Sequence, residues 1–296
     1  MRIFNASGCL DALTAPDTAR ALDVFVTKTV TPLPRGGNAP TRIAEVEHGM
    51  LNSIGLANPG IDCFVSSTLP RLADLGLPIW VSVGGFEVHD YAELCDRLDD
   101  RPEVAGIELN VSCPNVDDVP ASVGEIVKAA RAATRKLLFT KLSPATADVA
   151  EVARAAQAAG TDGLSLVNTI LGLALDERTL QPVLSRRSGG LSGPALKPIA
   201  LAAVFACYEA TGLPIVGMGG ITSGRDALEF LAAGAEAVAL GTVLFSDPAA
   251  PGRIRSELAE AAVAASVASP DDAIGLSHAG AGDPSASRAL NPSFSA

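Results

Sequence analysis

One pattern repeats along the sequence: a short apolar run, a glycine or polar residue, and then a stretch with helical periodicity. The runs Ile79–Val83 and Leu137–Leu142 are clear examples. Eight such units follow one another between residues 4 and 265. This alternation predicts parallel strands surrounded by helices, and eight units in one domain are typical of a closed barrel. We therefore predict an α/β protein with a (β/α)8 TIM barrel fold, since an open doubly wound sheet rarely uses eight units.

Two segments depart from the repeat. Residues 31–60 are rich in proline and glycine and have little helical periodicity, which predicts a long functional excursion from the barrel. Residues 279–296 are small and polar without any period. We therefore expect a barrel domain over residues 1–278 and a flexible C-terminal tail over 279–296.

Composition excludes several classes of protein. Hydrophobic residues make up 48% of the 296 residues, which is enough for a large core, and the net charge of −11 without a basic cluster argues against nucleic acid. Five scattered cysteines without a C-x-x-C pair, and only three histidines, predict no metal site. We expect Cys63, Cys95 and Cys207 to be small core residues. The sequence shows no signal peptide and no apolar run of the roughly eighteen residues that a membrane span needs, so we expect a cytoplasmic protein.

Active sites of such barrels lie at the carboxyl ends of the strands. The residues expected there are Ser7, Gly8, Lys28, Gly84, Gly85, Asn110, Cys113, Asn115, Lys141, Asn168, Gly219, Gly220, Gly241 and Thr242. Paired acids are missing from this set, which disfavours glycosidase chemistry. Glycines after the last two strands allow a phosphate to approach the backbone N–H groups, so we predict a phosphate site there.

Lysines and asparagines give this end its chemical character. Lys28 and Lys141 each lie in an apolar strand, where an unpaired ammonium is costly. Each could snorkel or pair with a carboxylate, but two together favour an anionic ligand or a negative charge that develops during reaction. The amides of Asn52, Asn110, Asn115 and Asn168 would suit a flat heterocycle, although any one of them alone could be a turn or cap residue.

Cys113 lies in the segment 107–115, IELNVSCPN, where an apolar strand ends in a polar turn before a proline. A thiol in such a turn has a pKa and an accessibility that its surroundings can tune. Both a nucleophile and a general base are open at this point. No histidine is near Cys113 in the sequence to activate a nucleophile.

At these residues the sequence resembles the class 1 dihydroorotate dehydrogenases. The resemblance runs from about Asn5 to the closing helix, and its most specific parts are VTKTVTPLPRGGN, MLNSIGLANPG, ELNVSCPN, TKLSP, VNT, GGLSGPALKP and GMGGITSGRDALEFLAAGA. It implies a (β/α)8 barrel that binds FMN. It also implies oxidation of dihydroorotate to orotate in de novo pyrimidine biosynthesis, with hydride transfer to the flavin.

The resemblance also implies a role for each matching residue. Cys113 would take the C5 proton, Lys141 would stabilise negative charge that develops on the flavin, and Lys28 would lie near both the substrate carboxylate and the flavin. The implied substrate-binding residues are Lys28, Asn52, Ile54, Gly55, Leu56, Asn110, Asn115, Asn168 and Thr169. The implied FMN-binding residues are Ser7, Gly8, Lys28, Thr29, Asn110, Lys141, Val167, Gly193, Gly219, Gly220, Gly241 and Thr242.

Subclass features point to a partner. A cysteine instead of a serine at position 113 resembles class 1 and not the membrane-associated class 2. The segment RGGNAPTR resembles subclass 1B, whose members work with a second subunit that carries FAD and an iron–sulfur cluster and passes electrons to NAD. The resemblance thus implies a homodimer or a heterotetramer with that subunit. The segment after SCPN, VDDVPAS, is shorter than the glycine-containing lid loop that is usual in the family, which bears on how the substrate is enclosed.

Three other functions stay open from the sequence. The first is a related FMN oxidoreductase that acts on another dihydropyrimidine or a cyclic amide. The second is a non-redox barrel, such as an aldolase or isomerase, that binds a phosphorylated metabolite. The third is a flavoprotein subunit that only relays electrons.

Overall fold

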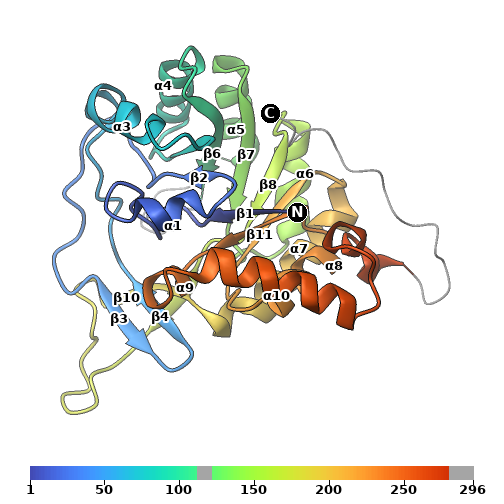
Figure 1. Cartoon of the computed structure of the whole chain (residues 1–296). Helices are drawn as coiled ribbons and strands as arrows, with labels where there is room; N and C mark the ends of the chain where they lie inside the picture. Colours follow the sequence, from blue (N-terminus) through green and yellow to red (C-terminus); the bar gives the residue numbers. More distant parts are fainter. Residues whose placement is uncertain (112–121, 280–296) are drawn as a thin grey trace.

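Eight parallel strands form the centre of the molecule and close into a barrel (Figure 1). The computed structural model describes residues 1–111 and 122–279. The strand order around the barrel is β1-β12-β11-β8-β7-β6-β5-β2, and a parallel bridge between Phe4 and Val24 joins the two ends. The strands are β1 (Arg2–Asn5), β2 (Phe25–Val26), β5 (Ile79–Val83), β6 (Val104–Asn110), β7 (Leu137–Leu142), β8 (Gly163–Leu166), β11 (Ile215–Met218) and β12 (Ala237–Leu240). The predicted (β/α)8 barrel is confirmed.

Helices cover the outside of the barrel (Figure 1). The α-helices are α1 (Pro16–Arg20), α2 (Ile61–Cys63), α3 (Leu69–Ala73), α4 (Val88–Asp99), α5 (Val123–Ala133), α6 (Val149–Ala158), α7 (Lys197–Thr211), α8 (Gly224–Ala232), α9 (Val243–Ser246) and α10 (Ala250–Ala264). Ser122 and Ser223 begin α5 and α8 with reciprocal capping boxes, as the Ser-x-x-acid spacing favours.

Aromatic side chains fill the interior of the barrel below its mouth. Phe4 meets Trp80 edge to face at 5.1 Å between ring centroids, and Trp80 meets Phe139 at 4.7 Å. Two glycines, one on β6 and one on β8, make room for these rings. A Cβ on Gly106 would lie 2.7 Å from Trp80 Nε1, and one on Gly163 would collide with the ring of Phe139. The barrel is thus a packed core at this depth, and a ligand has space only nearer its mouth.

A second sheet, which the sequence did not predict, lies beside the barrel (Figure 1). Its antiparallel strands, in the order β3-β4-β10-β9, are β3 (Ile43–Val46), β4 (Gly49–Asn52), β10 (Ser188–Ser192) and β9 (Ile170–Leu173). The strands are short and only partly buried, so they lack the clear alternation that signals a strand. Pairing of β4 with β10 also joins segments more than a hundred residues apart. The excursion predicted over residues 31–60 contains β3 and β4, which are two of the four strands of this sheet.

Three local expectations are settled by the structure. Cys95 and Cys207 are buried, and burial raises the pKa of each thiol to about 12. The prediction for Cys63 was wrong, because this residue ends α2 with its side chain exposed. Lys28 lies two residues beyond the short strand β2 instead of inside it.

No helix among residues 1–111 and 122–279 is long and apolar enough to cross a membrane. The cytoplasmic location stays a prediction. The tail proposed for 279–296 lies outside the described residues from 280 onward, so the boundary at 278 also stays a prediction.

Candidate active site

Most of the predicted site residues lie at the carboxyl end of the barrel. Ser7 and Gly8 follow β1, Lys28 and Thr29 follow β2, and Asn110 is the last residue of β6. Around the rest of the ring, the site residues are Lys141 near the end of β7, Val167 to Thr169 after β8, Gly219 and Gly220 after β11, and Gly241 and Thr242 after β12. Because the strands are parallel, these ends share one rim.

A cationic cluster occupies one side of this rim. Lys141 is buried, and its Nζ donates a hydrogen bond to Ser7 Oγ at 3.1 Å. Lys28 packs over Gly8 so closely that a Cβ there would lie 2.9 Å from Lys28 Cδ. Burial lowers the pKa of Lys28, and the positive charge of Lys141 lowers it further. The two lysines therefore make this side of the rim a favourable place for an anion.

Cys9 lies against this cluster. Its thiol is half-buried, and burial raises its pKa while the charges of Lys141 and Lys28 oppose that rise. A Cβ on Gly241 would lie 3.9 Å from Cys9 Sγ, which places the end of β12 beside the end of β1. The cationic cluster and Gly241 are thus neighbours.

A chain of amides and hydroxyls adjoins this cluster, because Asn110 at the end of β6 pairs with Lys141 on β7. Asn168 Nδ2 donates to Asn110 Oδ1 at 3.0 Å, and Asn110 Nδ2 donates to Thr29 Oγ1 at 3.2 Å. Thr29 is hydrogen-bonded in turn to Ser82 at 3.0 Å. The N–H of Thr169 is held by Asn168 Oδ1. These hydrogen bonds orient the two amides, as the recognition of a flat polar ring requires.

The second sheet adds Asn52 to this side. Asn52 Nδ2 donates to the carbonyl of Gly190 on β10 at 3.2 Å. Thr169 lies directly against Gly190, because a Cβ at that glycine would collide with Thr169 Oγ1. Asn52 is therefore linked to the hydrogen-bonded chain of Asn168 and Asn110 only indirectly, through Gly190 of β10 and Thr169.

Glycines make a close backbone junction between β10 and β11. Gly193, Gly219 and Gly220 all have positive φ, which favours glycine at each position. A Cβ on Gly220 would lie 2.8 Å from the carbonyl oxygen of Gly193, so these two predicted phosphate-binding residues are adjacent. By contrast, a Cβ on Gly241 would meet nothing closer than 3.8 Å. Val167 is buried, and its N–H donates to Met218, which ties β8 to β11.

The segment Ile54, Gly55 and Leu56 makes its contacts elsewhere. The carbonyl of Ile54 accepts from the Asn38 N–H at 3.0 Å, and that of Leu56 accepts from Asn58 Nδ2 at 2.7 Å. These hydrogen bonds hold residues 54–56, which follow β4, against Asn38 and Asn58. Cys113, Asn115 and most of the shortened loop lie outside the described residues, so their predicted roles stay predictions.

Glu108 is a site residue that our sequence reasoning overlooked. It is buried on β6, with Oε1 at 4.0 Å from Lys141 Nζ. A signal was available, because the period of two along β6 places Glu108 on the same inward face as Asn110.

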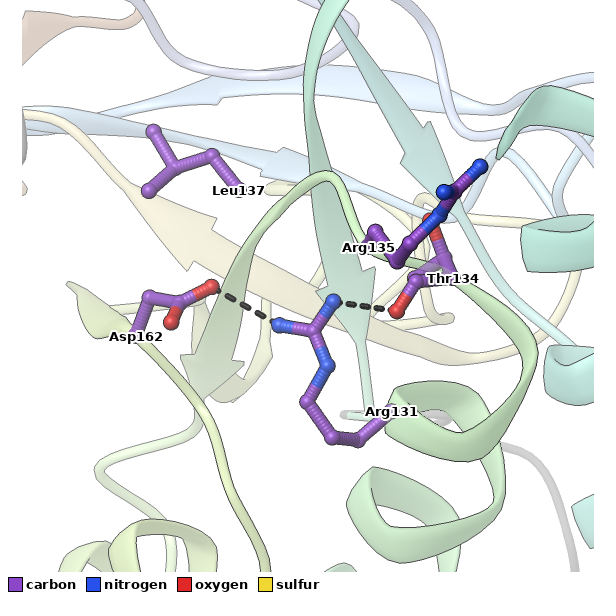
Figure 2. A pocket seen from close by; sticks show the side chains of 5 residues that line it. All are labelled: Arg131, Thr134, Arg135, Leu137 and Asp162. Carbon is purple, nitrogen blue, oxygen red and sulfur yellow. Dashed lines mark hydrogen bonds and ion pairs between the residues drawn. The ribbon is translucent and has the colours of Figure 1, made fainter. Parts of the chain in front are cut away.

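Figure 2 shows a different cavity, of about 510 Å³, at the opposite end of the barrel. Arg131 crosses it and donates to Asp162 at 2.9 Å, to the carbonyl of Lys136 at 2.9 Å, and to the carbonyl of Thr134. Leu137 is the first residue of β7, so the cavity lies at the amino ends of the strands. That face of a barrel serves stability, and the contacts of Arg131 fit such a role.

Comparisons with known proteins agree with this geometry. A family model described as dihydroorotate dehydrogenase matches residues 2–261. The chain is 48% identical over 236 residues to the dihydroorotate dehydrogenase B (NAD(+)) catalytic subunit of Pelobacter propionicus, which covers 77% of this chain and 78% of that protein. It is 42% identical over 264 residues to the protein of that name from Desulforudis audaxviator, with coverage of 87% and 86%. The crystal structure of DHODH from Eimeria tenella in complex with ferulenol is similar with a TM-score of 0.80 and 25% identity, over 95% of this chain and 86% of that one.

Proposed function

The chain belongs to the dihydroorotate dehydrogenase family of flavin-dependent oxidoreductases, and on that premise we propose that it oxidises dihydroorotate to orotate with bound FMN. The observation that carries the proposal is the placement of two lysines beside a chain of ordered amides at one barrel mouth. This arrangement suits a flat ring that has both a carboxylate and imide edges, as dihydroorotate does.

The residues at the mouth fit FMN. Gly193 and Gly220 bring two backbone segments together with no side chain between them, and Gly241 lies beside Cys9 at the cationic cluster. We assign the phosphate to these glycines with Gly219 and Thr242, because glycine lets backbone N–H groups approach an anion. Ser7, Gly8, Thr29 and Val167 would contact the rest of the cofactor. When bound, FMN supplies a ring that accepts hydride.

The two lysines of the cationic cluster would stabilise negative charge, both on the substrate and where it develops during the reaction. Lys28 would attract the substrate carboxylate, while Lys141, held by Ser7, would stabilise negative charge where it develops. This division of roles follows their positions, since Lys141 is buried in β7 and Lys28 lies beyond its strand at the rim.

The amides would orient the substrate ring. Asn52, Asn110, Asn115 and Asn168 would bind its imide edges with Thr169, and the backbone of residues 54–56 would lie near the carboxylate. Cys113 would take the C5 proton as general base. Hydrogen bonds from Asn168 to Asn110 and from Asn110 to Thr29 hold these two amide side chains in place before the substrate arrives. Substrate binding therefore needs little further ordering of these two side chains.

We also propose a partner subunit. The relatives from Pelobacter propionicus and Desulforudis audaxviator are named catalytic subunits of an NAD(+) enzyme. This supports an assembly in which a second subunit with FAD and an iron–sulfur cluster carries electrons from this chain to NAD.

The absorption spectrum of the purified protein tests the function. We expect flavin bands that are bleached within seconds by anaerobic dihydroorotate, and FMN in the supernatant after denaturation. Dihydrouracil is the matched control, because it has the same ring without the carboxylate and should bleach the flavin far more slowly. Faster bleaching by dihydrouracil than by dihydroorotate would instead support the related oxidoreductase, and a protein without flavin bands would support the non-redox barrel.

A further inference from the structure

Glu108 brings a carboxylate into the interior of the barrel. Its side chain is 2% exposed, and Oε1 accepts no hydrogen bond from the described residues. Isolated burial of an ionised carboxylate is strongly unfavourable unless a positive charge offsets it. Lys141 Nζ lies 4.0 Å from Oε1, and its side chain is 6% exposed, so the two form a buried ion pair.

Lys141 Nζ has one partner for its charge, Glu108, and another for its hydrogen bond, Ser7. At 4.0 Å the carboxylate attracts the ammonium without accepting its hydrogen, and Nζ donates instead to Ser7 Oγ at 3.1 Å. Glu108 precedes Asn110 by two residues on β6, so its backbone lies roughly 6–7 Å deeper in the barrel than that of Asn110. The ammonium thus has its negative partner toward the core and its hydroxyl partner at the rim.

A second lysine, Lys28, lies near the pair. Lys28 lies on the rim side, where the charge of Lys141 contributes to lowering its pKa. The Cys9 thiol also lies beside both lysines, and burial raises its pKa. Glu108 thus places a carboxylate against Lys141.

We propose that Glu108 is a positioning residue for Lys141, whose carboxylate holds the ammonium at the barrel mouth and limits the net positive charge that a bound flavin experiences. The inference rests on the proposed function only in taking that ligand to be a flavin. Reduction adds negative charge to the ring, so the positive charge around it controls the reduction potential.

The flavin midpoint potential of Glu108→Gln is the decisive measurement. We expect a more positive potential than in the native protein, because the change removes a carboxylate from beside Lys141 and keeps the side-chain shape. Lys141→Met should shift the potential in the opposite direction. Glu108→Asp, which keeps the charge, should return the potential most of the way to the native value.

Glu236→Gln is the matched control. Glu236 also has a buried carboxylate oxygen without a hydrogen bond from the described residues, but it precedes β12 at the amino end of the barrel. Its removal should leave the potential unchanged. If Glu108→Gln also leaves the potential unchanged, the inference is overturned, and Glu108 is then only a packing residue.

A double-mutant cycle on urea unfolding of the flavin-free chain gives a readout that needs neither flavin nor substrate. Removing one member of a buried ion pair leaves the other charge unpaired. The double variant Glu108→Gln/Lys141→Met should therefore lose roughly half, or less, of the unfolding free energy that is obtained by adding the losses of the two single variants. Additive losses would overturn the inference. If dihydroorotate fails to reduce the flavin while the potentials and the cycle behave as expected, the proposed function falls and this inference stands.

Discussion

Lys28 and Lys141 show how two like residues at one rim can differ in behaviour. Burial and the charge of Lys141 both lower the pKa of Lys28, while Lys141 has Glu108 at 4.0 Å and Ser7 at 3.1 Å. The sequence placed both lysines in apolar strands and left open whether they pair with carboxylates. The structure shows that Lys141 does so, and that Lys28 lies beyond its strand.

At the residue scale, Cys113→Ser tests the general base. We expect the variant to keep its flavin but to be reduced by dihydroorotate about 10²–10⁴-fold more slowly at pH 7, because a hydroxyl is a much poorer proton acceptor than a thiolate. Anaerobic stopped-flow absorbance measures this rate.

The matched control for Cys113 is Cys63→Ser, whose side chain is exposed on α2. Its reduction rate should equal that of the native protein. A native rate in Cys113→Ser would remove Cys113 from the role of base.

At the scale of elements, the turn between β11 and α8 is held by one carboxylate. Asp226 Oδ1 accepts from Lys197 Nζ at 2.6 Å, and Oδ2 accepts from the backbone N–H groups of Thr222 and Ser223 at 2.9 Å. Burial alone would raise the pKa of Asp226, but the hydrogen bonds from Lys197, Thr222 and Ser223 outweigh it and lower the pKa to about 2. Because Lys197 also packs against Gly220, this clamp supports the glycine junction that we assign to phosphate.

The clamp predicts a pH-dependent loss of stability. The folded pKa of Asp226 lies below its unfolded value, so its contribution is fully present above about pH 4 and is lost as pH falls toward 2. A shift of this size corresponds to ~2 kcal/mol. We therefore expect the difference in unfolding free energy between the native protein and Asp226→Asn to shrink by about that amount between pH 4 and 2, as measured by urea denaturation.

Asp17→Asn serves as the control for the clamp, because Asp17 forms an exposed pair with Arg20 on α1. Its unfolding free energy should follow that of the native protein at every pH. A constant difference between native protein and Asp226→Asn across the range would contradict the assignment.

At the scale of the whole molecule, the barrel and the second sheet meet at one rim. β9 begins directly after Asn168 and Thr169, so the end of β8 leads from the barrel into the sheet. Asn52 reaches the site only because β4 pairs with β10. The site is thus assembled by both sheets.

Electron transfer to NAD would be a property of the proposed assembly with the partner subunit. The five cysteines of the chain contain no closely spaced pair that would suit an iron–sulfur cluster. We therefore expect the isolated chain with dihydroorotate and NAD to form no NADH, whereas a complex purified from native cells should form it and contain FAD and iron. Absorbance at 340 nm measures the product.

Fumarate is the comparison acceptor for this experiment. Turnover of the isolated chain with fumarate at the rate of the native complex with NAD would argue against the partner subunit. NADH formation by the isolated chain would contradict the prediction directly.

Sequence patterns predicted the barrel, its strand ends and most residues of the rim. This was possible because strand and helix periods are local properties, and because parallel strands in a barrel bring their carboxyl ends together whatever the details of packing. The resemblance added roles for single residues, and the family comparisons agree with it. The roles themselves stay predictions, and Cys113 and Asn115 lie outside the described residues.

Only the tertiary structure decided which of these residues are neighbours. The second sheet pairs short, half-exposed strands that are far apart in sequence, so no local period announced it. Glu108 and Lys141 lie on adjacent strands, but their contact depends on both side chains pointing into a closed barrel. The sequence by itself determined the barrel and the chemical groups at its mouth, because these follow from local patterns. The tertiary structure decided the charge balance among those groups, because electrostatic interaction depends on distance in space.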